Sequence, residues 1–304
     1  MHILALIIQF VLVCLAAPLV SGIITKIKNN LRMRKGPPVL QPYYNIVKLL
    51  SKDEVVSETA SWIFRAAPVV GLSSSLTALA LVPAVIAGNP GALAGDFLAI
   101  IFIFSLGRFF TALAGLDAGS PFGGMGSSRE MFIASLAEPC ACLAVFGLFL
   151  QSGSTNPELL GVYPHIATIL AALCLMMVII AETSRLPIDN QETHLELTMI
   201  HEAMCLEYSG RGLAFIEIGS YIKQIVWFSL LAYILFPSAV AVSAGTGALG
   251  LAILIYAAKI TGLAAVVAVL EVLIAKMRLF RVVDYFGFSI VFGVLAAISS
   301  LMGI

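Results

Sequence analysis

The feature that most constrains this chain is a series of eight long apolar stretches. A helix that crosses the hydrocarbon core of a bilayer needs about 20 apolar residues, and each stretch, with its flanks, is close to that length or longer. Charged residues make up only 11% of the chain, against about 25% in an ordinary soluble domain. The stretches are Ile3 to Ile24, Ala66 to Ile86, Phe97 to Leu116, Met131 to Leu150, Ile166 to Ala181, Gln224 to Val242, Leu249 to Ala275 and Tyr285 to Gly303.

The apolar residues form continuous runs, whereas strands of a membrane β-barrel alternate over about ten residues. We therefore expect an all-α integral membrane protein, a single domain over residues 1–304 with about eight transmembrane helices. The first run lacks a basic leader and an Ala-x-Ala cleavage site, so we expect it to be a retained span and not a signal peptide.

Basic residues concentrate in the loops that follow odd-numbered spans, and the loops after even-numbered spans hold none. By the positive-inside rule the odd-numbered loops are cytoplasmic, and an even number of spans then places both termini on the outer side. The expected cytoplasmic loops one, three, five and seven cover residues 25–65, 117–130, 182–212 and 276–284.

Loop one contains a sharp break at Gly36, Pro37 and Pro38. After it, apolar residues recur at helical spacing, which predicts a short amphipathic helix. Its apolar positions are Tyr43, Ile46, Val47, Leu49 and Leu50. Such a helix lies along the membrane surface or docks on a cytosolic partner, and the alternative is a solvated basic loop.

Loop three is rich in glycine, at Gly115, Gly119, Gly123, Gly124 and Gly126, and we expect it to be flexible or tightly turned. It lacks the preceding strand and the Lys-Ser/Thr ending of a phosphate-binding loop, which argues against nucleotide binding.

Two carboxylates follow this glycine-rich segment. Glu130 opens the next span, where it can complement the helix dipole. Glu138 lies about two turns inside that span beside Pro139. A carboxylate inside the membrane is by default a functional candidate.

Loop five holds six of the chain's 17 acidic residues. Glu192 and Glu196 are four apart, so they share one helix face, where like charges disfavour each other unless one is protonated or paired. Such a cluster is typical of a proton relay, and the alternative is a solvated acidic surface. The six are Glu182, Asp189, Glu192, Glu196, Glu202 and Glu207.

No metal or cofactor site is predicted. The pair His201-Glu202 begins a zinc-protease pattern, but the position of the second histidine is Cys205. His194 and His201 alone are a weak metal signal, and the five cysteines include no C-x-x-C pair. A net charge of +0 gives no indication of a nucleic-acid partner.

Three further ionisable residues, Arg108, Lys259 and Glu271, interrupt apolar spans. Glu271 lies twelve residues after Lys259, about 120° around the helix, so the two cannot pair directly. Each needs a partner from another helix or subunit. Lys223 lies near the edge of a span, where a lysine side chain ordinarily snorkels to the interface.

Three motifs, in this order, resemble the family of complex I subunit 1, the membrane subunit that anchors the peripheral arm of respiratory complex I and of related hydrogenases. They are the R-x-G-P element and its helix at Arg34 to Leu50, the glycine-rich turn and glutamate-bearing helix at Gly115 to Glu138, and the acidic stretch ending in E-Y-S-G at Glu182 to Gly210. The strings GLDAGSPF and GSSRE are most similar to the membrane-bound nickel–iron hydrogenases, the branch of formate hydrogenlyase and hydrogenase 4.

This resemblance implies a membrane-anchoring and coupling subunit in the cytoplasmic (inner) membrane of a prokaryote. Its partners would be hydrogenase large and small (iron–sulfur) subunits on the cytoplasmic face, antiporter-like membrane subunits and the lipid bilayer. The nickel–iron centre and the iron–sulfur clusters would belong to the partners, with no cofactor in this chain. Electron transfer and hydrogen evolution in the docked module would be linked to proton or sodium translocation.

The resemblance also implies residue roles. The ion pathway would comprise Glu130, Glu138, Glu182, Asp189, Glu192, Glu196, Glu202, Glu207, Lys259 and Glu271. Docking of the peripheral subunits would involve Arg34, Gly36, Pro37, Gln41, Lys48, Arg129 and Arg185.

Two other functions compete with this one. The first is the quinone-site subunit of an NADH:quinone oxidoreductase, whose fifth loop typically reads A-P-F-D-x-x-E-G-E-S-E. This chain has Leu186-Pro187-Ile188-Asp189 and then a different string, which weakens that function. The second is a self-contained carrier, but the inverted repeats and broken helices of such folds are not evident in the sequence.

Overall fold

The computed structural model describes residues 2–57, 59–82, 86–87, 96–156, 165–189, 199–237, 240–241 and 246–303. The described part is built almost entirely of helices, with two short strands, β1 (Ile86–Ala87) and β2 (Val240–Ala241), that pair in parallel. The helices are α1 (His2–Leu31), α2 (Gln41–Leu50), α3 (Trp62–Leu81), α4 (Phe97–Asp117), α5 (Pro121–Ser152), α7 (Ile166–Glu182), α8 (His201–Cys205), α9 (Gly210–Leu235), α10 (Thr246–Leu273), the 3-10 turn η1 (Leu279–Arg281) and α11 (Val282–Met302).

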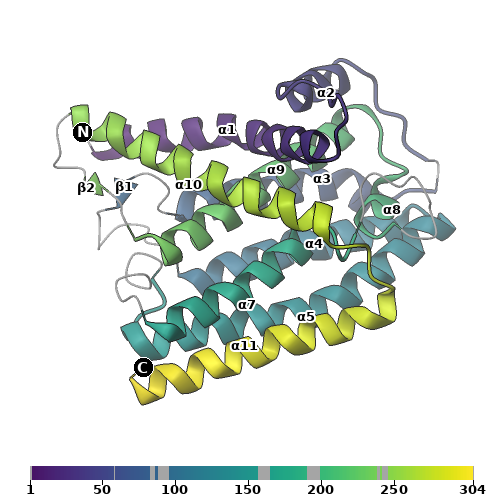
Figure 1. Ribbon diagram of the computed structural model, residues 1–304. Helices are drawn as coiled ribbons and strands as arrows, with labels where there is room; N and C mark the ends of the chain where they lie inside the picture. Colours follow the sequence, from purple (N-terminus) through teal and green to yellow (C-terminus); the bar gives the residue numbers. More distant parts are fainter. Residues whose placement is uncertain are drawn as a thin grey trace.

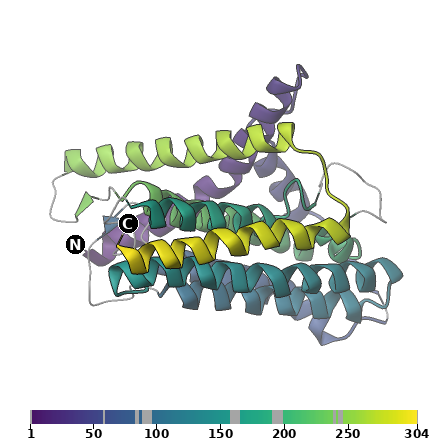
Figure 2. The same ribbon diagram turned by 60° about the horizontal axis from the view of Figure 1, so that its bottom comes forward.

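The long helices form a bundle with both chain termini at one end and the short helices α2 and α8 at the other (Figures 1 and 2). Among the described residues, seven helices are long and apolar enough to cross a membrane. The eighth predicted stretch forms α7, an apolar helix of 17 residues, near the lower limit for a span. The prediction of an all-α, multi-pass membrane protein is confirmed.

The centre of the bundle is α9. Two thirds of its most apolar stretch (67%) is buried within the protein, against 28% for α10 and for α11. Trp227 on α9 lies among Phe97 and Phe104 of α4, with ring centroids 6.4 and 5.8 Å from its own. Because α9 is surrounded by protein, polar side chains on it are shielded from lipid.

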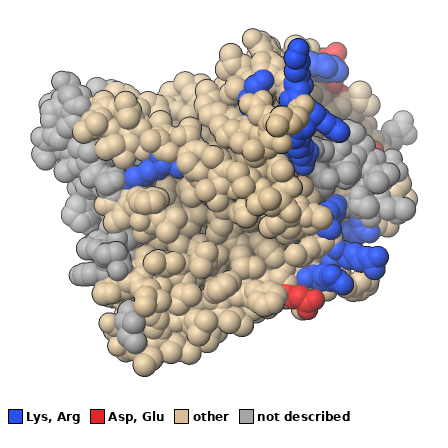
Figure 3. All heavy atoms as spheres, viewed as in Figure 1, with Lys and Arg blue, Asp and Glu red and all other residues tan. Residues whose placement is uncertain are grey.

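The amphipathic helix predicted in loop one is confirmed as α2. Its Tyr43 hydroxyl donates a hydrogen bond to the Leu15 carbonyl of α1, whereas Tyr44 and Val47 remain exposed. Lys and Arg residues gather at the bundle end that carries α2 (Figure 3). This is the end that the positive-inside rule assigns to the cytoplasm.

The tight turn expected in the glycine-rich segment lies between α4 and α5, where Gly119 has a φ of 68°. The rest of the segment, from Pro121 onward, is helical. It forms the start of α5, with Ser120 as the cap, its Oγ accepting from Gly123 N at 3.1 Å, and Pro121 in the first turn. A Cβ at Gly123 would lie 2.3 Å from Gly115 O, and one at Gly126 would lie 2.9 Å from the Cβ of Ala203. The glycines therefore serve close packing of α5 on α4 and α8.

The E-Y-S-G motif holds three segments together. The Tyr208 hydroxyl donates to Phe64 O at 2.7 Å, and the two rings stack 4.0 Å apart. Ser209 Oγ accepts from Val55 N at 2.8 Å. Gly210 has a φ of 51°, and a Cβ there would lie 2.5 Å from Asp53 O. The motif thus fastens the end of loop one to the first turns of α3 and α9.

The packing of α5 on α8 predicts that Gly126→Ala is less stable than Gly124→Ala. Both changes bring the same gain in helix propensity. Only the Cβ at position 126 overlaps a neighbour, since the nearest atom at position 124 is 3.9 Å away. We expect a difference of about 1–3 kcal/mol in the free energy of unfolding measured in mixed detergent micelles. Equal stabilities would contradict this role of Gly126.

Candidate functional site

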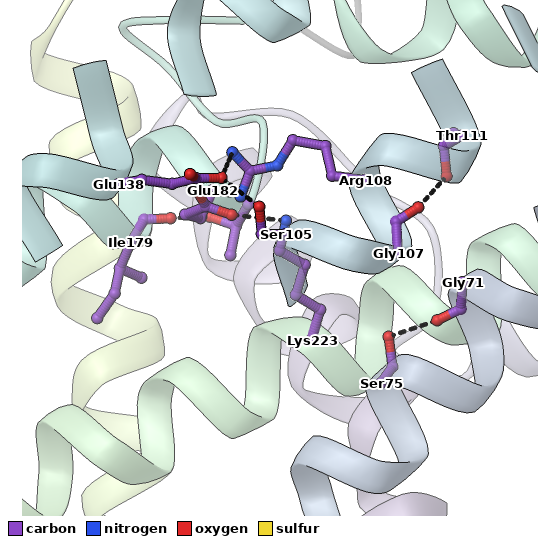
Figure 4. A network of polar contacts seen from close by, with 11 residues as sticks. Gly71, Ser75, Ser105, Gly107, Arg108, Thr111, Glu138, Ile179, Glu182 and Lys223 are labelled. Carbon is purple, nitrogen blue, oxygen red and sulfur yellow. Dashed lines mark hydrogen bonds and ion pairs between the residues drawn. The ribbon is translucent and has the colours of Figure 1, made fainter. Parts of the chain in front are cut away.

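A buried network of charges joins α4, α5, α7 and α9 (Figure 4). Glu182 at the end of α7 binds Arg108 Nη2 at 2.5 Å and Lys223 Nζ at 2.7 Å. Arg108 Nη1 also lies 3.5 Å from Oε1 of Glu138, which accepts a hydrogen bond from Ser105 Oγ at 2.6 Å. A charge inside an apolar bundle is costly unless it is paired, and here each cation has a carboxylate.

This network confirms that Arg108 takes its partners from other helices. The snorkelling expected for Lys223 is wrong, because the side chain turns inward to Glu182. Lysine snorkels when only lipid or interface is within reach. Here a buried carboxylate on a neighbouring helix is close enough to bind the ammonium group directly.

A second network joins α1, α10 and the segment after α7. Glu271 of α10 accepts from Lys28 Nζ at 2.9 Å through Oε2 and from Arg185 Nη1 at 2.7 Å through Oε1. Arg185 Nη2 donates to Gln224 Oε1 at 3.1 Å. The prediction that Glu271 pairs outside its own helix is confirmed. Arg185, which we expected on the docking surface, is only 8% exposed and is committed to this network.

Asp189 lies beside the second network and is 2% exposed. Its Oδ1 is 3.3 Å from Lys276 Nζ, and its Oδ2 accepts from the backbone N–H groups of Ile200 and His201 at 3.2 and 3.1 Å. Asp189 therefore ties the end of α10 to the start of α8.

The two networks border one cavity of about 110 Å³. Arg108, Glu182 and Lys223 line it from one network, and Arg185 and Gln224 from the other. Small residues of α3, α4 and α9 leave the space between them, including Gly71, Ser74, Ser75, Gly107, Thr111 and Gly219. A polar space of this size suits a few water molecules and is well below the roughly 300–1,000 Å³ of typical small-molecule sites.

Glu130 belongs to this cavity and not to a helix start. Because α5 begins at Pro121, Glu130 lies in its third turn, where it lines the cavity together with His201 of α8. Among the described residues, Gln224 Nε2 and Arg185 Nε have no hydrogen-bond partner in the protein. The walls of the cavity thus combine carboxylates with buried donors, the groups that a proton path through water requires.

An acidic cluster includes Glu202 of α8 and nearby carboxylates. Burial raises the pKa of Glu202 to about 7, assisted by the negative charges of Asp189 and Glu217, while Lys276 acts in the opposite direction. Glu217 of α9 was not among the predicted site residues. A carboxylate two turns inside an apolar helix is the signal that could have found it.

Two further predicted pathway residues, Glu207 and Lys259, do not line the cavity. Glu207 is exposed. Lys259 donates to the Phe236 carbonyl at the end of α9 at 2.6 Å, so its partner also comes from another element. Glu192 and Glu196 lie outside the described residues.

The predicted docking residues other than Arg185 lie at the α2 end of the bundle. Arg34, Pro37 and Lys48 are exposed, and Gly36 and Gln41 are partly exposed. Arg129, also partly exposed, donates to Met199 O at 3.2 Å. An exposed basic surface of this kind is available to a partner, and docking itself stays a prediction.

Buried charges, a cavity lined by ionisable groups and, among the described residues, seven helices long and apolar enough to cross a membrane define a multi-pass membrane protein with an internal ionisable site. The chain belongs to the NADH dehydrogenase family, whose family model matches residues 3–302. This confirms the resemblance drawn from the three motifs.

Two curated relatives come from Escherichia coli (strain K12). Formate hydrogenlyase subunit 4 is 33% identical over 286 residues, which cover 92% of each chain. Hydrogenase-4 component C is 36% identical over 235 residues, 75% of this chain and 74% of that one. Among solved structures, a chain of the membrane-bound sulfane sulfur reductase, an archaeal respiratory membrane complex, superposes with a TM-score of 0.82 over 98% of this chain and 99% of that chain, at 16% identity. That likeness concerns the fold alone.

The raised pKa of Glu202 predicts a pH-dependent stability. The folded protein holds this proton up to about pH 7, whereas an unfolded glutamic acid releases it near its ordinary value of 4.5. The protonated Glu202 carboxyl therefore contributes its full stabilisation of the folded state below about pH 4.5. This contribution is lost as the pH rises through 7. Between about pH 5 and 8, Glu202→Gln should lower the dependence of the unfolding temperature on pH. The exposed Glu207→Gln is the control, and an unchanged dependence in Glu202→Gln would contradict the assignment.

Neutralisation of the Glu182 carboxylate is predicted to lower the free energy of unfolding by a large amount. Glu182→Gln would leave Arg108 and Lys223 buried without their shared carboxylate, which costs about 3–5 kcal/mol. The free energy of unfolding in mixed micelles measures the loss, with Glu207→Gln as the matched exposed control. A change below about 1 kcal/mol, typical of surface ion pairs, would show that water reaches this network.

Proposed function

We propose that this chain is the membrane-anchoring and coupling subunit of a membrane-bound hydrogenase complex of the formate hydrogenlyase type. The observation that carries the proposal is the pair of buried ion networks around one polar cavity, which lies under α8 at the end of the bundle with the basic surface. The two Escherichia coli relatives, named after formate hydrogenlyase and hydrogenase-4, support the choice of complex.

In this role the chain performs no redox chemistry. Hydrogenase large and small subunits, with the nickel–iron centre and the iron–sulfur clusters, dock on the cytoplasmic loops, and antiporter-like subunits lie alongside in the inner membrane. An electron that arrives in the docked module adds negative charge, which favours protonation of nearby carboxylates. Glu202, which is part of α8, receives this influence first, and Glu130 lines the cavity next to α8.

The next residue in the proposed path is Glu138, which belongs to the network of Arg108 and Glu182. It is the most exposed carboxylate of its network, with 32% of the side chain accessible, and it contacts Arg108 at 3.5 Å. Glu138 has one close cation and one hydroxyl partner, whereas Glu182 is held between two cations. Glu138 is therefore the group through which protons or sodium ions pass on toward neighbouring subunits.

A quinone-site subunit of an NADH:quinone oxidoreductase is the alternative, and membership of the NADH dehydrogenase family keeps it in consideration. The size of the cavity, about 110 Å³, disfavours a substituted quinone ring, since sites for such ligands are several times larger.

The first test is purification of the tagged chain in mild detergent, followed by mass spectrometry and a hydrogen-evolution assay. Copurifying hydrogenase subunits with hydrogen activity would support the proposal. Flavin-containing, NADH-oxidising subunits with quinone reductase activity would assign the chain to complex I, and an oligomer of this chain alone would indicate a carrier.

The coupling role predicts the behaviour of Glu138→Gln in the intact complex. Hydrogen evolution should continue, because no redox centre is touched, while ion uptake into vesicles driven by it should fall to background. Asp284→Asn, at an exposed carboxylate near the start of α11, should retain both. Undiminished ion uptake by Glu138→Gln would remove this residue from the path.

A further inference from the structure

One end of α10 contacts the segment of residues 185–189 at three points. Glu271 binds Arg185 at 2.7 Å, Met277 N donates to Pro187 O at 2.9 Å, and Lys276 binds Asp189 at 3.3 Å. Glu271 lies on α10, and Lys276 and Met277 lie just after it. We call these three residues the α10 clamp.

Three of the four charged side chains in the clamp contacts are shielded from water, and the fourth, Lys276, is 24% exposed. Glu271 is 4% exposed, Arg185 8% and Asp189 2%. In such surroundings an ion pair is screened little, and removal of one partner leaves a buried charge without compensation. The clamp is therefore a strong mechanical connection and not a surface contact.

The clamped segment leads to two parts of the functional site. At its start, Arg185 lines the cavity and binds Gln224. It follows Ser184, whose φ of 52° is unusual for a residue with a side chain, so the surrounding contacts determine the course of the chain here. At its end, Asp189 accepts the backbone N–H groups of Ile200 and His201, where α8 begins.

On its other side the clamp reaches α1. Lys28 of α1 is the second cation on Glu271, and α1 and α9 are the main neighbours of α10. In Figure 2 α10 lies on the opposite side of the bundle from α5. The clamp therefore connects the outlying pair α1 and α10 to the cavity wall and to α8.

We propose that Glu271 is a positioning residue: the α10 clamp holds the 185–189 segment so that Arg185 stays at the cavity wall and α8 stays over the cavity, and it passes any displacement of α8 to α1 and α10. Glu271 acts here through Arg185 and Lys28. Its role is to fix where the cavity-lining groups lie, separate from the transfer of protons through Glu130, Glu138 or Glu202.

Hydrogen–deuterium exchange on the full chain tests this connection. Glu271→Gln should accelerate exchange of the Ile200 and His201 amides by about tenfold or more, the scale of one hydrogen bond to a charged group. These amides contact Asp189 and not α10 itself. The control is Asp284→Asn, an exposed carboxylate near the start of α11, which should leave them unchanged.

If Glu271 only stabilised α10, faster exchange would be confined to α10 and the residues just after it, and the proposal would fail. Lys276→Met serves as a second variant in case Glu271→Gln does not fold, because it removes the ion pair to Asp189 and keeps the buried pairs of Glu271. It should accelerate the same two amides, and unchanged rates in this variant would also overturn the clamp. Hydrogen–deuterium exchange measures the effect of the clamp whichever subunits copurify with the chain. A failure of the clamp proposal is therefore distinguishable from a failure of the proposed hydrogenase role.

Discussion

The structure depends on one constraint, which is that a charge buried in an apolar bundle needs an opposite charge within contact distance. Glu182 meets this need for Arg108 and Lys223, and Glu271 meets it for Lys28 and Arg185. Each carboxylate thus holds two cations from different segments. Because the partners come from α1, α4, α9 and the segment after α7, the same pairs that neutralise charge also set how the helices lie.

Small residues allow these pairs to form. Glycine at positions 107, 115, 123 and 126 brings α4, α5, α3 and α8 closer than any side chain would permit. Between the closely packed helices, Ser and Thr hydroxyls bind carbonyls of their own helices, as Ser75 does with Gly71 and Thr111 with Gly107 (Figure 4). The space that remains is the polar cavity, so tight packing and an internal ionisable site arise from the same residues.

The proposed function combines docking of partner subunits with ion transfer among the helices. The exposed basic surface and α8 lie at one end of the bundle, and the buried networks extend from there among the long helices. Under the proposed function, Glu202, with a pKa of about 7, is the carboxylate of α8 that responds to an electron in the docked module. The α10 clamp adds a mechanical route beside this electrostatic one, since Asp189 contacts both α8 and Lys276.

The sequence by itself determined the all-helical membrane class, the family and the amphipathic α2, because apolar runs and local motifs are properties of contiguous residues. It also marked Arg108, Lys259 and Glu271 as charges within apolar spans that need partners, and Glu138 as a functional candidate. Only the tertiary structure decided which partners they have. It turned Lys223 inward, buried Arg185, made a helix of the glycine-rich segment and added Glu217 to the site. Each of these depends on distances between segments far apart in the chain, which periodicity and composition do not contain.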